Sequence, residues 1–147
     1  MDEEIKQVEE PKKQPGAVMI GTPAYGSMVH IDYCKSLIEF INQGTSYTML
    51  AMGNESLISR GRNNILSMFW HNEQFDKLLF IDADIYLPGS GFKDLMSALD
   101  SGKYDVMGAG VRLKSHQVIY NFNPGEDGVK TDETGRYLQC KFLGTAV

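Results

Sequence analysis

The feature that most restricts the possible folds of this chain is a set of three short apolar runs. Segments with helical periodicity separate these runs from one another. The runs are AVMIGT (17–22), SYTMLAM (46–52) and KLLFID (77–82). Each is as long as a β-strand and apolar over most of its length, which is typical of strands buried on both faces. Strands that alternate with helices are joined by right-handed crossovers and lie parallel. The sequence therefore predicts an α/β fold with a mostly parallel, Rossmann-like sheet covered by helices.

The segments between these runs carry the spacing and the end signals of helices. Residues 27–44 are predicted as a helix with Ser27 as a candidate N-cap and Gly44 as its stop. Its expected inward side chains are Ile31, Cys34, Leu37, Ile38 and Ile41. Residues 55–74 are predicted as a second helix, with the expected inward side chains Leu57, Ile58, Ile65, Leu66 and Phe69.

The rhythm of the chain changes after Arg112. Before that point, residues 91–102 predict a third helix and YDVMGAG (104–110) predicts a fourth strand. After it, residues 117–144 have the pattern of two strands around a polar, Gly-rich loop, which indicates an antiparallel addition.

The two ends of the chain differ in character. Residues 1–15 are charged with mixed sign, so we expect a mobile tail followed by a single domain over residues 16–147. The last residues, FLGTAV (142–147), have the pattern of an apolar strand with nothing after it. We therefore expect the chain to be part of a longer protein.

Charge and cysteine content narrow the class of protein. Lys and Arg number 14 against 19 Asp and Glu, a net charge of −5, which argues against a protein that binds nucleic acid by neutralising phosphates. Cys34 and Cys140 lie too far apart for a zinc motif, and no apolar run has the length of a membrane span or a signal peptide. A cytoplasmic protein with no membrane span and no nucleic-acid partner is expected.

Two carboxylates stand at the end of the third apolar run, in KLLFIDADIYLPG (77–89). Side chains at i and i+2 of an extended segment point to the same face, so Asp82 and Asp84 can converge while Ala83 points away. At about 5 Å their repulsion is about 3 kcal/mol at an effective dielectric of 20, which a cation would offset. Oxygen ligands suit Mg²⁺ or Mn²⁺, and ligands bind beyond the carboxyl ends of parallel strands. Alternatively, Asp84 caps the following turn and Asp82 is a solvated loop acid.

Two further segments are expected at the same edge of the sheet. In SRGRNN (59–64), Arg60 and Arg62 diverge by about 200° on a helix, so only one can face a phosphate or the acids and the other is a surface charge. Gly61 between them serves a close approach or a helix kink. In GTPAYG (21–26), the turn presents Tyr25, which either covers a base or sugar or packs on the sheet.

Together these elements resemble the GT-A family of nucleotide-sugar-dependent glycosyltransferases, in particular the small enzymes encoded by phages and large DNA viruses. The resemblance lies in MIGTPAYGS (19–27), ESLISRGRNNIL (55–66), the DxD segment KLLFIDADIYLPG and YDVMGAGVRLKS (104–115). It implies a GT-A fold with a donor-binding half over residues 16–115 and the start of an acceptor half over residues 116–147. For a viral enzyme, the cytoplasm would be that of the host.

The resemblance also implies a site and an activity. The donor would be a UDP- or GDP-sugar, and the acceptor a glycan, a lipid or a protein. Asp84 would bind Mn²⁺ or Mg²⁺ directly, and Asp82 would lie by the metal and the ribose. The other implied donor-binding residues are Thr22, Pro23, Ala24, Tyr25, Asn54, Arg62, Ala83 and Lys114. Asn54 replaces an acid that the family often has, which leaves the base open.

The acceptor chemistry stays open at this stage. The ion would stabilise the departing nucleoside diphosphate while an acceptor hydroxyl attacks the anomeric carbon. In the family, the acceptor platform and any general base follow a segment that resembles CKFLGTAV (140–147). No catalytic base is therefore assigned, although Asp105, Glu126 and Asp127 are available acids, and retention or inversion is undecided. Lys114 and His116 could reach the donor, but His116 also fits a surface position.

Three other functions compete with a glycosyltransferase. One is a non-catalytic module that binds a nucleotide sugar. Another is a phosphatase of the haloacid dehalogenase type, which carries its Asp-x-Asp on the first strand and a Thr or Val where this chain has Tyr86. The third is a nucleotidyltransferase, which usually opens with an Arg-containing Gly-rich loop that GTPAYGSM (21–28) does not match.

Overall fold

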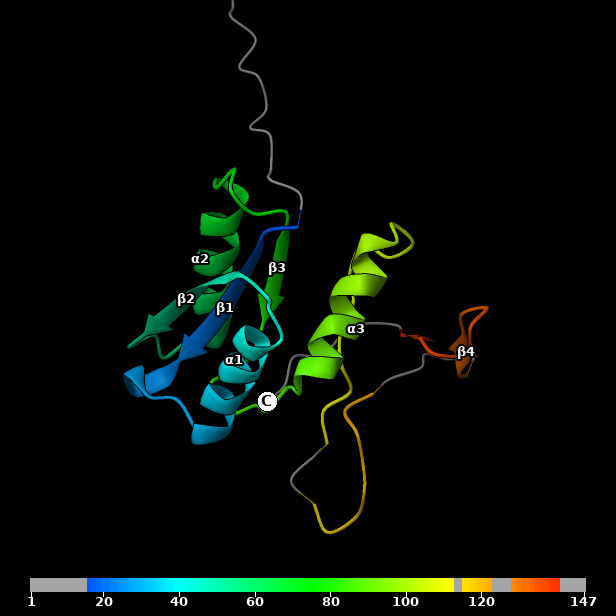
Figure 1. Ribbon diagram of the computed structural model, residues 1–147. Coiled ribbons are helices and arrows are strands. Elements are labelled where there is room, and N and C mark those ends of the chain that lie inside the picture. Colours follow the sequence, from blue (N-terminus) through cyan, green and yellow to red (C-terminus); the bar gives the residue numbers. More distant parts are fainter. Residues whose placement is uncertain (1–15, 113–114, 123–127, 141–147) are drawn as a thin grey trace, which may run out of the picture. The chain divides into compact units, whose positions relative to one another are not determined.

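The structure, a computed structural model, describes residues 16–112, 115–122 and 128–140 (Figure 1). In chain order the elements are β1 (Val18–Ala24), the 3₁₀ helix η1 (Tyr25–Ser27), α1 (Ile31–Asn42), β2 (Tyr47–Gly53), α2 (Ile58–Trp70), β3 (Lys77–Phe80), α3 (Gly89–Asp100), β4 (Lys130–Thr131) and β5 (Leu138–Gln139). They belong to two compact units, Met1–Tyr86 and Leu87–Val147. The predicted tail over 1–15 and the last apolar residues, 142–147, lie outside the described residues.

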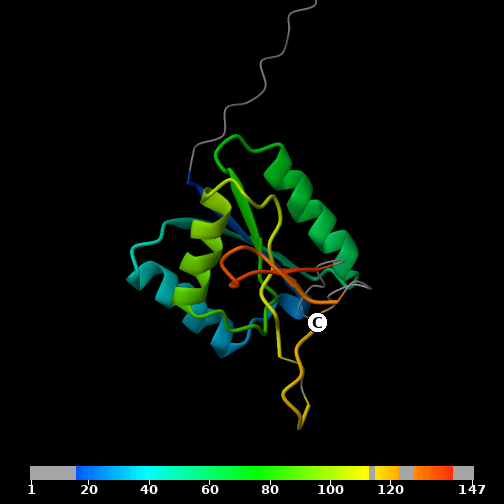
Figure 2. The same ribbon diagram turned by 90° about the vertical axis from the view of Figure 1, so that its right-hand side faces the viewer.

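The first unit is a three-stranded parallel sheet in the order β2-β1-β3, which confirms the predicted α/β class. β1 pairs with β2 over seven residues, from Val18 opposite Tyr47 to Ala24 opposite Gly53. β3 pairs with the first half of β1. Helices α1 and α2 cover opposite faces of this sheet (Figures 1 and 2). The central strand is therefore enclosed on both faces, as its continuous apolar sequence predicts.

The core of the first unit lies where α2 packs on β1. Met19 of β1, Phe69 of α2 and Phe75 form a buried cluster, and Leu50 and Leu78 pack against it from the neighbouring strands. Gly21 lets α2 approach closely, because a Cβ atom built on Gly21 would lie 2.5 Å from Cγ2 of Ile65. A side chain at this position would push the helix away from the strand.

The buried face of α1 differs from the predicted one. Its buried residues are Tyr33, Ser36 and Phe40. Ile31, Ile38 and Ile41 are exposed instead, and Cys34 and Leu37 are half-buried. The difference has a physical cause, because hydrogen bonds satisfy the polar groups that this face buries. The Ser36 hydroxyl donates to the Asp32 carbonyl and the Tyr33 hydroxyl is bonded to Thr22.

The N-cap of α1 and the inward face of α2 also differ from those predicted. The N-cap of α1 is His30, whose Nδ1 accepts from the Asp32 amide, whereas the predicted cap, Ser27, lies in η1. Gly44 follows the end of α1 with φ 78°, a conformation that suits a stop. On α2, Ile65 and Phe69 are buried as predicted, but the predicted inward residues Leu57, Ile58 and Leu66 are exposed.

The second unit consists of α3, extended segments and a short antiparallel pair. β4 pairs with β5, and Arg112 forms an isolated antiparallel bridge with Tyr120, which agrees with the predicted antiparallel addition. The fourth strand predicted over residues 104–110 is not present, because this extended segment pairs with no other described strand. Within the described residues, no helix combines the length and the apolar character that crossing a bilayer requires.

Candidate functional site

The carboxyl ends of the three parallel strands meet at one edge of the first unit. The Ile81 amide donates to the Gly21 carbonyl over 3.2 Å, which continues the pairing of β3 with β1 beyond the strand itself. Asp82 therefore follows directly beside the last residues of β1. On the other side, Ala24 lies opposite Gly53 in the last pair of β1 and β2. The three segments singled out in the sequence are thus brought to a single edge, where parallel sheets bind ligands.

Asp82 at this edge is held by Arg62 of α2. Nη2 of Arg62 donates to Oδ1 of Asp82 over 2.5 Å, and the two side chains are 17% and 18% exposed. Burial raises the pKa of Asp82, whereas the hydrogen bond and the charge of Arg62 lower it. The nearby Asp84 carboxylate adds to the raising effect. Arg62 is thus the arginine that faces the acids, as the divergence of the two arginines on the helix predicted.

Asp84 lies two residues further along and is exposed. A turn in which the Ile85 amide donates to the Asp82 carbonyl brings the chain round at this point. Between the acids, the Ala83 carbonyl accepts from the His30 amide over 2.8 Å and so ties the loop to the start of α1. Asp84 is therefore the more solvent-exposed acid of the pair.

A metal at this position would have few protein ligands. In the part of the chain that the structure describes, no three His, Cys, Asp or Glu side chains are grouped so that they could hold a metal ion. Asp82 and Asp84 are the carboxylates at hand, and Arg62 already binds one oxygen of Asp82. Such a set fits Mg²⁺ or Mn²⁺ only if phosphate oxygens and water complete the coordination, which is how Mg²⁺ is usually bound.

The predicted donor-binding segment after Gly21 consists of the last three residues of β1 and the first residue of η1, because the strand runs on to Ala24 and the turn begins only at Tyr25. Thr22 is fully buried, and its hydroxyl is 2.6 Å from the Tyr33 hydroxyl. Pro23 is half-buried and Ala24 is buried, whereas Tyr25 is 75% exposed. Only Tyr25 therefore offers a whole side chain to a ligand, and the prediction for Thr22 is restricted to its backbone.

Two residues near this segment adopt a left-handed backbone conformation that is uncommon for residues with a side chain. Ser27 has φ 56° and Asn54 has φ 57°. The Ser27 side chain fills the space beside Gly53, because a Cβ atom built on Gly53 would lie 2.3 Å from Ser27 Oγ. The loop after β1 thus packs on the end of β2 and places Asn54 next to it. Strained residues of this kind tend to gather at functional sites.

Glu55 was not singled out in the sequence, yet it organises the start of α2. Its carboxylate accepts two hydrogen bonds of 2.6 Å from Arg60 and one of 3.0 Å from the Leu57 amide. The Arg60 guanidinium and the Leu57 amide hold the pKa of Glu55 down to about 2. An acid in the first turn of a predicted helix is a signal for this role. Arg60 is thus the surface charge of the two arginines.

Two remaining predictions concern Gly61 and Lys114. Gly61 is buried in α2, but a Cβ atom built on it would lie 3.4 Å from Cγ of Glu55, which is ordinary contact. Sterics therefore do not require a glycine here. Lys114 lies outside the described residues, as do Glu126 and Asp127. His116 and Asp105 are exposed in the second unit.

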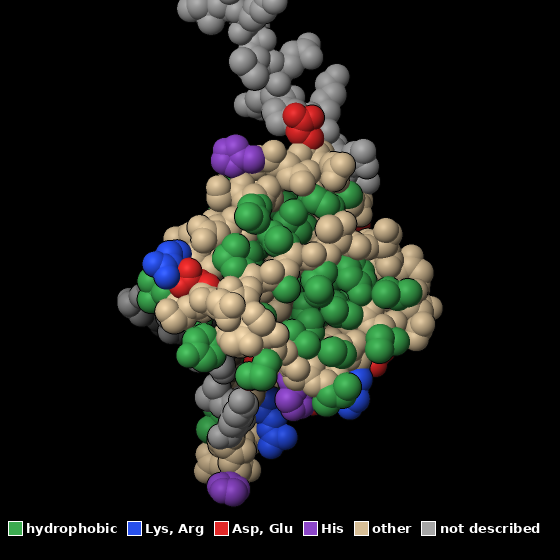
Figure 3. Space-filling view, turned by 90° about the vertical axis from the view of Figure 1, so that its left-hand side faces the viewer, with side chains coloured by type: hydrophobic (Ala, Val, Ile, Leu, Met, Phe, Trp, Pro, Cys, Tyr) green, Lys and Arg blue, Asp and Glu red, His purple; other side chains and the backbone are tan. Residues whose placement is uncertain are grey.

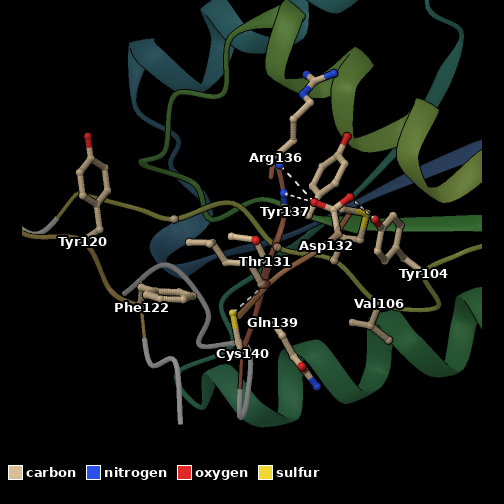
Figure 4. A pocket seen from close by; sticks show the side chains of 14 residues that line it. Tyr104, Val106, Tyr120, Phe122, Thr131, Asp132, Arg136, Tyr137, Gln139 and Cys140 are labelled. Carbon is tan, nitrogen blue, oxygen red and sulfur yellow. Dashed lines mark hydrogen bonds between the residues drawn. The ribbon is translucent and has the colours of Figure 1, made fainter. Parts of the chain in front are cut away.

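The second unit has a cavity of its own, which the sequence did not indicate. It has a volume of about 870 Å³ and is lined by residues from 104–110, 120–122 and 131–140. In Figure 4, Tyr120 and Phe122 lie on one side of it and Tyr104 and Val106 on the other. Because these residues are scattered in three extended segments, no periodic pattern could have brought them together.

Asp132 organises one wall of this cavity. Its carboxylate accepts hydrogen bonds from the Tyr104 hydroxyl and from the amides of Arg136 and Tyr137 (Figure 4). The Thr134 hydroxyl donates a further one. These donors hold the pKa of Asp132 well below its usual value, and the Thr134 hydroxyl contributes most. Arg136 is paired with Asp94 over 3.1 Å. Both charged residues are thus engaged within the second unit. Four of the fourteen residues that line the cavity are aromatic, namely Tyr104, Tyr120, Phe122 and Tyr137.

No protein-family model, no curated protein and no solved structure matches this chain. The assignment of a function therefore depends on the residues themselves. The edge of the first unit combines an exposed carboxylate, a half-buried carboxylate held by an arginine, an exposed aromatic ring and a strained loop. Chemically, such an edge can hold a divalent cation together with a phosphorylated ligand that carries a ring.

Proposed function

We propose that this chain contains the donor-binding part of a metal-dependent glycosyltransferase that uses a UDP- or GDP-sugar. The observation that carries the proposal is the pairing of Arg62 with Asp82 beside the exposed Asp84, at the carboxyl end of a parallel sheet. A structural salt bridge would not need a second acid two residues away. A ligand site for a cation and a diphosphate would use both acids and the arginine.

The roles of the residues follow from their exposure. Asp84, which is open to solvent, would bind Mn²⁺ or Mg²⁺ directly, and Asp82 would lie beside the ion. A bound ion would neutralise the diphosphate when it leaves the sugar. Arg62 holds Asp82 in place and presents the positive charge nearest to it, which favours a phosphate at the same position. Tyr25 would cover the base or the sugar from the loop after β1.

A thermal-shift panel with UDP- and GDP-sugars tests this function. With Mn²⁺ or Mg²⁺, a cognate donor at a hundredfold excess over its Kd should raise the melting temperature by roughly 5–10 °C. Asp84→Ala should abolish the rise. Asp105→Ala, which removes an exposed acid from the second unit, is the matched control and should leave the rise unchanged. Equal stabilisation by the nucleotide sugars in EDTA would contradict a shared metal.

Turnover separates the remaining alternatives. Release of the nucleoside diphosphate from the cognate donor, lost in Asp84→Ala, supports a transferase rather than a module that only binds. Metal-dependent hydrolysis of a generic phosphate monoester, lost in Asp82→Asn, would favour the phosphatase instead. In the structure, the Asp-x-Asp follows β3 at the side of the sheet, whereas that phosphatase carries it on its first strand.

A further inference from the structure

One side of the first unit exposes a strand edge and an apolar helix stripe, which we call the β2 surface. It consists of β2 with the exposed Met49, and of Ile31, Cys34, Ile38 and Ile41 on α1. Figure 3 looks onto the side of the molecule where β2 lies, and hydrophobic side chains gather there. None of the residues of this surface takes part in the proposed donor site.

The strand edge lacks the usual protection against pairing. β2 bonds to β1 along all seven residues, and none of the described residues forms a strand on its other side. Tyr47–Gly53 contains no charged residue and no proline, and its pairing with β1 is continuous, without a bulge. These are the devices by which proteins blunt an edge. β3, the other outer strand, is only four residues long and begins with Lys77.

The helix stripe has the spacing of a helix–helix seam. Ile31, Cys34, Ile38 and Ile41 are separated by three, four and three residues, the alternation that lines up apolar side chains along one helix face. This face is not the one that packs on the sheet, which is formed by Tyr33, Ser36 and Phe40. The three isoleucines are 57–63% exposed. They therefore form a second apolar face that no described residue of the first unit covers.

We propose that a second copy of this chain covers the β2 surface, with the two β2 strands paired antiparallel. The two-fold axis of such a pair is perpendicular to the sheet, so each α1 stays on the same side as its copy. The uncharged β2 of one copy then pairs with the uncharged β2 of the other, and the apolar stripes of the two α1 helices lie near each other. Each part of the surface is thus complementary to itself, which an isologous dimer requires. No like charges oppose each other across the strand edge, despite the net charge of −5.

The size of the surface sets the strength of the dimer. A whole aliphatic side chain accounts for roughly 60–120 Å² of apolar surface, so the exposed parts of this stripe and of Met49 offer on the order of 200–300 Å². The strand backbone adds to this, but the sum stays below the roughly 800 Å² per partner of a standard interface. The dimer is therefore reversible, with a dissociation constant in the micromolar range.

Sedimentation velocity over a range of concentrations tests the dimer. The wild-type chain should shift from monomer to dimer as its concentration rises through the micromolar range. Ile38→Glu and Met49→Lys, which each place a charge on an exposed position of the surface, should each weaken the dimer at least tenfold. Val118→Glu, which places the same charge as Ile38→Glu on an exposed apolar residue of the second unit, is the matched control and should dimerise as the wild type does.

A cross-link tests the register. If all seven residues pair, Leu50 lies on the two-fold axis and Met49 lies opposite Ala51 of the second copy. In a background without Cys34 and Cys140, a mixture of Met49→Cys and Ala51→Cys chains should form a disulfide-linked dimer on oxidation, and either chain without the other should not. A wild-type chain that stays monomeric at every concentration would overturn the proposal. So would a dimer that persists unchanged in both Ile38→Glu and Met49→Lys.

Discussion

The hydroxyl pair of Thr22 and Tyr33 joins the last part of β1 to α1. Thr22 is fully buried and Tyr33 is 1% exposed, and their oxygens are 2.6 Å apart. Burial raises the pKa of the Tyr33 hydroxyl, so it stays protonated and one of the two groups always donates. A buried hydroxyl that loses its partner keeps its full desolvation cost. This pair therefore fixes the position of the loop that carries Tyr25.

A double-mutant cycle measures this bond. Thr22→Val and Tyr33→Phe should each lower the free energy of unfolding by about 1–3 kcal/mol, because each leaves one buried hydroxyl without a partner. The double variant should cost clearly less than the two single losses added together, because both polar groups are then gone. Urea denaturation provides the three values.

The exposed Tyr25 serves as the control for this cycle. Tyr25→Phe also removes a tyrosine hydroxyl, but from a side chain that is 75% exposed. It should change the free energy of unfolding by less than about 0.5 kcal/mol. Strict additivity of Thr22→Val and Tyr33→Phe would contradict a direct bond between the two hydroxyls.

For individual residues, the sequence predicted that only one arginine would face the acids, but it did not predict that Thr22 would be buried. Neighbouring positions on a strand or a helix have fixed directions, so the spacing of Arg60 and Arg62 implied that only one could face Asp82. Nothing comparable indicates that Thr22 is buried, because its partner is eleven residues away on another element. Burial of a polar side chain depends on a tertiary contact that local spacing does not contain.

The contact between α2 and β1 depends on Gly21 of β1, whereas Gly61 of α2 is dispensable. A Cβ atom on Gly21 would lie 2.5 Å from Ile65, closer than Cβ atoms approach other atoms, and 3.3 Å from Phe80, which is a tight contact. A Cβ atom on Gly61 would meet Glu55 at 3.4 Å. Neither residue has a positive φ, so alanine fits the backbone at both positions. The two substitutions therefore differ only in packing and in helix propensity.

Gly21→Ala and Gly61→Ala should change stability in opposite directions. Gly21→Ala should lower the free energy of unfolding by about 1–3 kcal/mol, because the new methyl group forces the strand and the helix apart. Gly61→Ala should raise it by about 0.4–1 kcal/mol, because alanine reduces the freedom of the unfolded chain and favours the helix. Thermal or chemical denaturation of the two variants checks both signs. A destabilised Gly61→Ala would show that the position serves a closer approach than the structure has.

The strands and helices could be predicted from long apolar runs and long helical periodicity. The buried face of a helix could not be predicted where two of its faces are apolar. The three parallel strands and three α-helices follow from such patterns. On α1, however, isoleucines lie on one side and Tyr33 and Phe40 on another, and hydrophobic periodicity favours the isoleucines. The segment 104–110 is apolar as a strand would be, but a strand needs a partner, and a pattern in one segment cannot supply it.

Across the whole chain, the apolar core is divided unequally between the two units. In the first unit, the buried hydrophobic residues are Val18, Met19, Ile20, Ala24, Tyr33, Phe40, Ile65, Phe69, Phe75 and Ile81. In the described part of the second unit they are Phe92 and Ala98, both on α3. The boundary after residue 115 that the resemblance implies separates a donor-binding half from an acceptor half, which is a division by function and not by where the core lies.

The two units should therefore differ in independent stability. Residues 16–86, expressed without the rest, should unfold in one cooperative transition, because domains of 55–65 residues with a single core already fold on their own. Residues 87–147, expressed in the same way, should melt without a sharp transition, because the two buried hydrophobic residues in the described part of this unit are too few to offset the conformational entropy that folding costs. Circular dichroism and calorimetry of both fragments distinguish these outcomes. A fragment 16–86 that is unstructured at all temperatures would contradict a self-contained core, and a cooperative transition in 87–147 would show that its aromatic cavity closes into a core of its own.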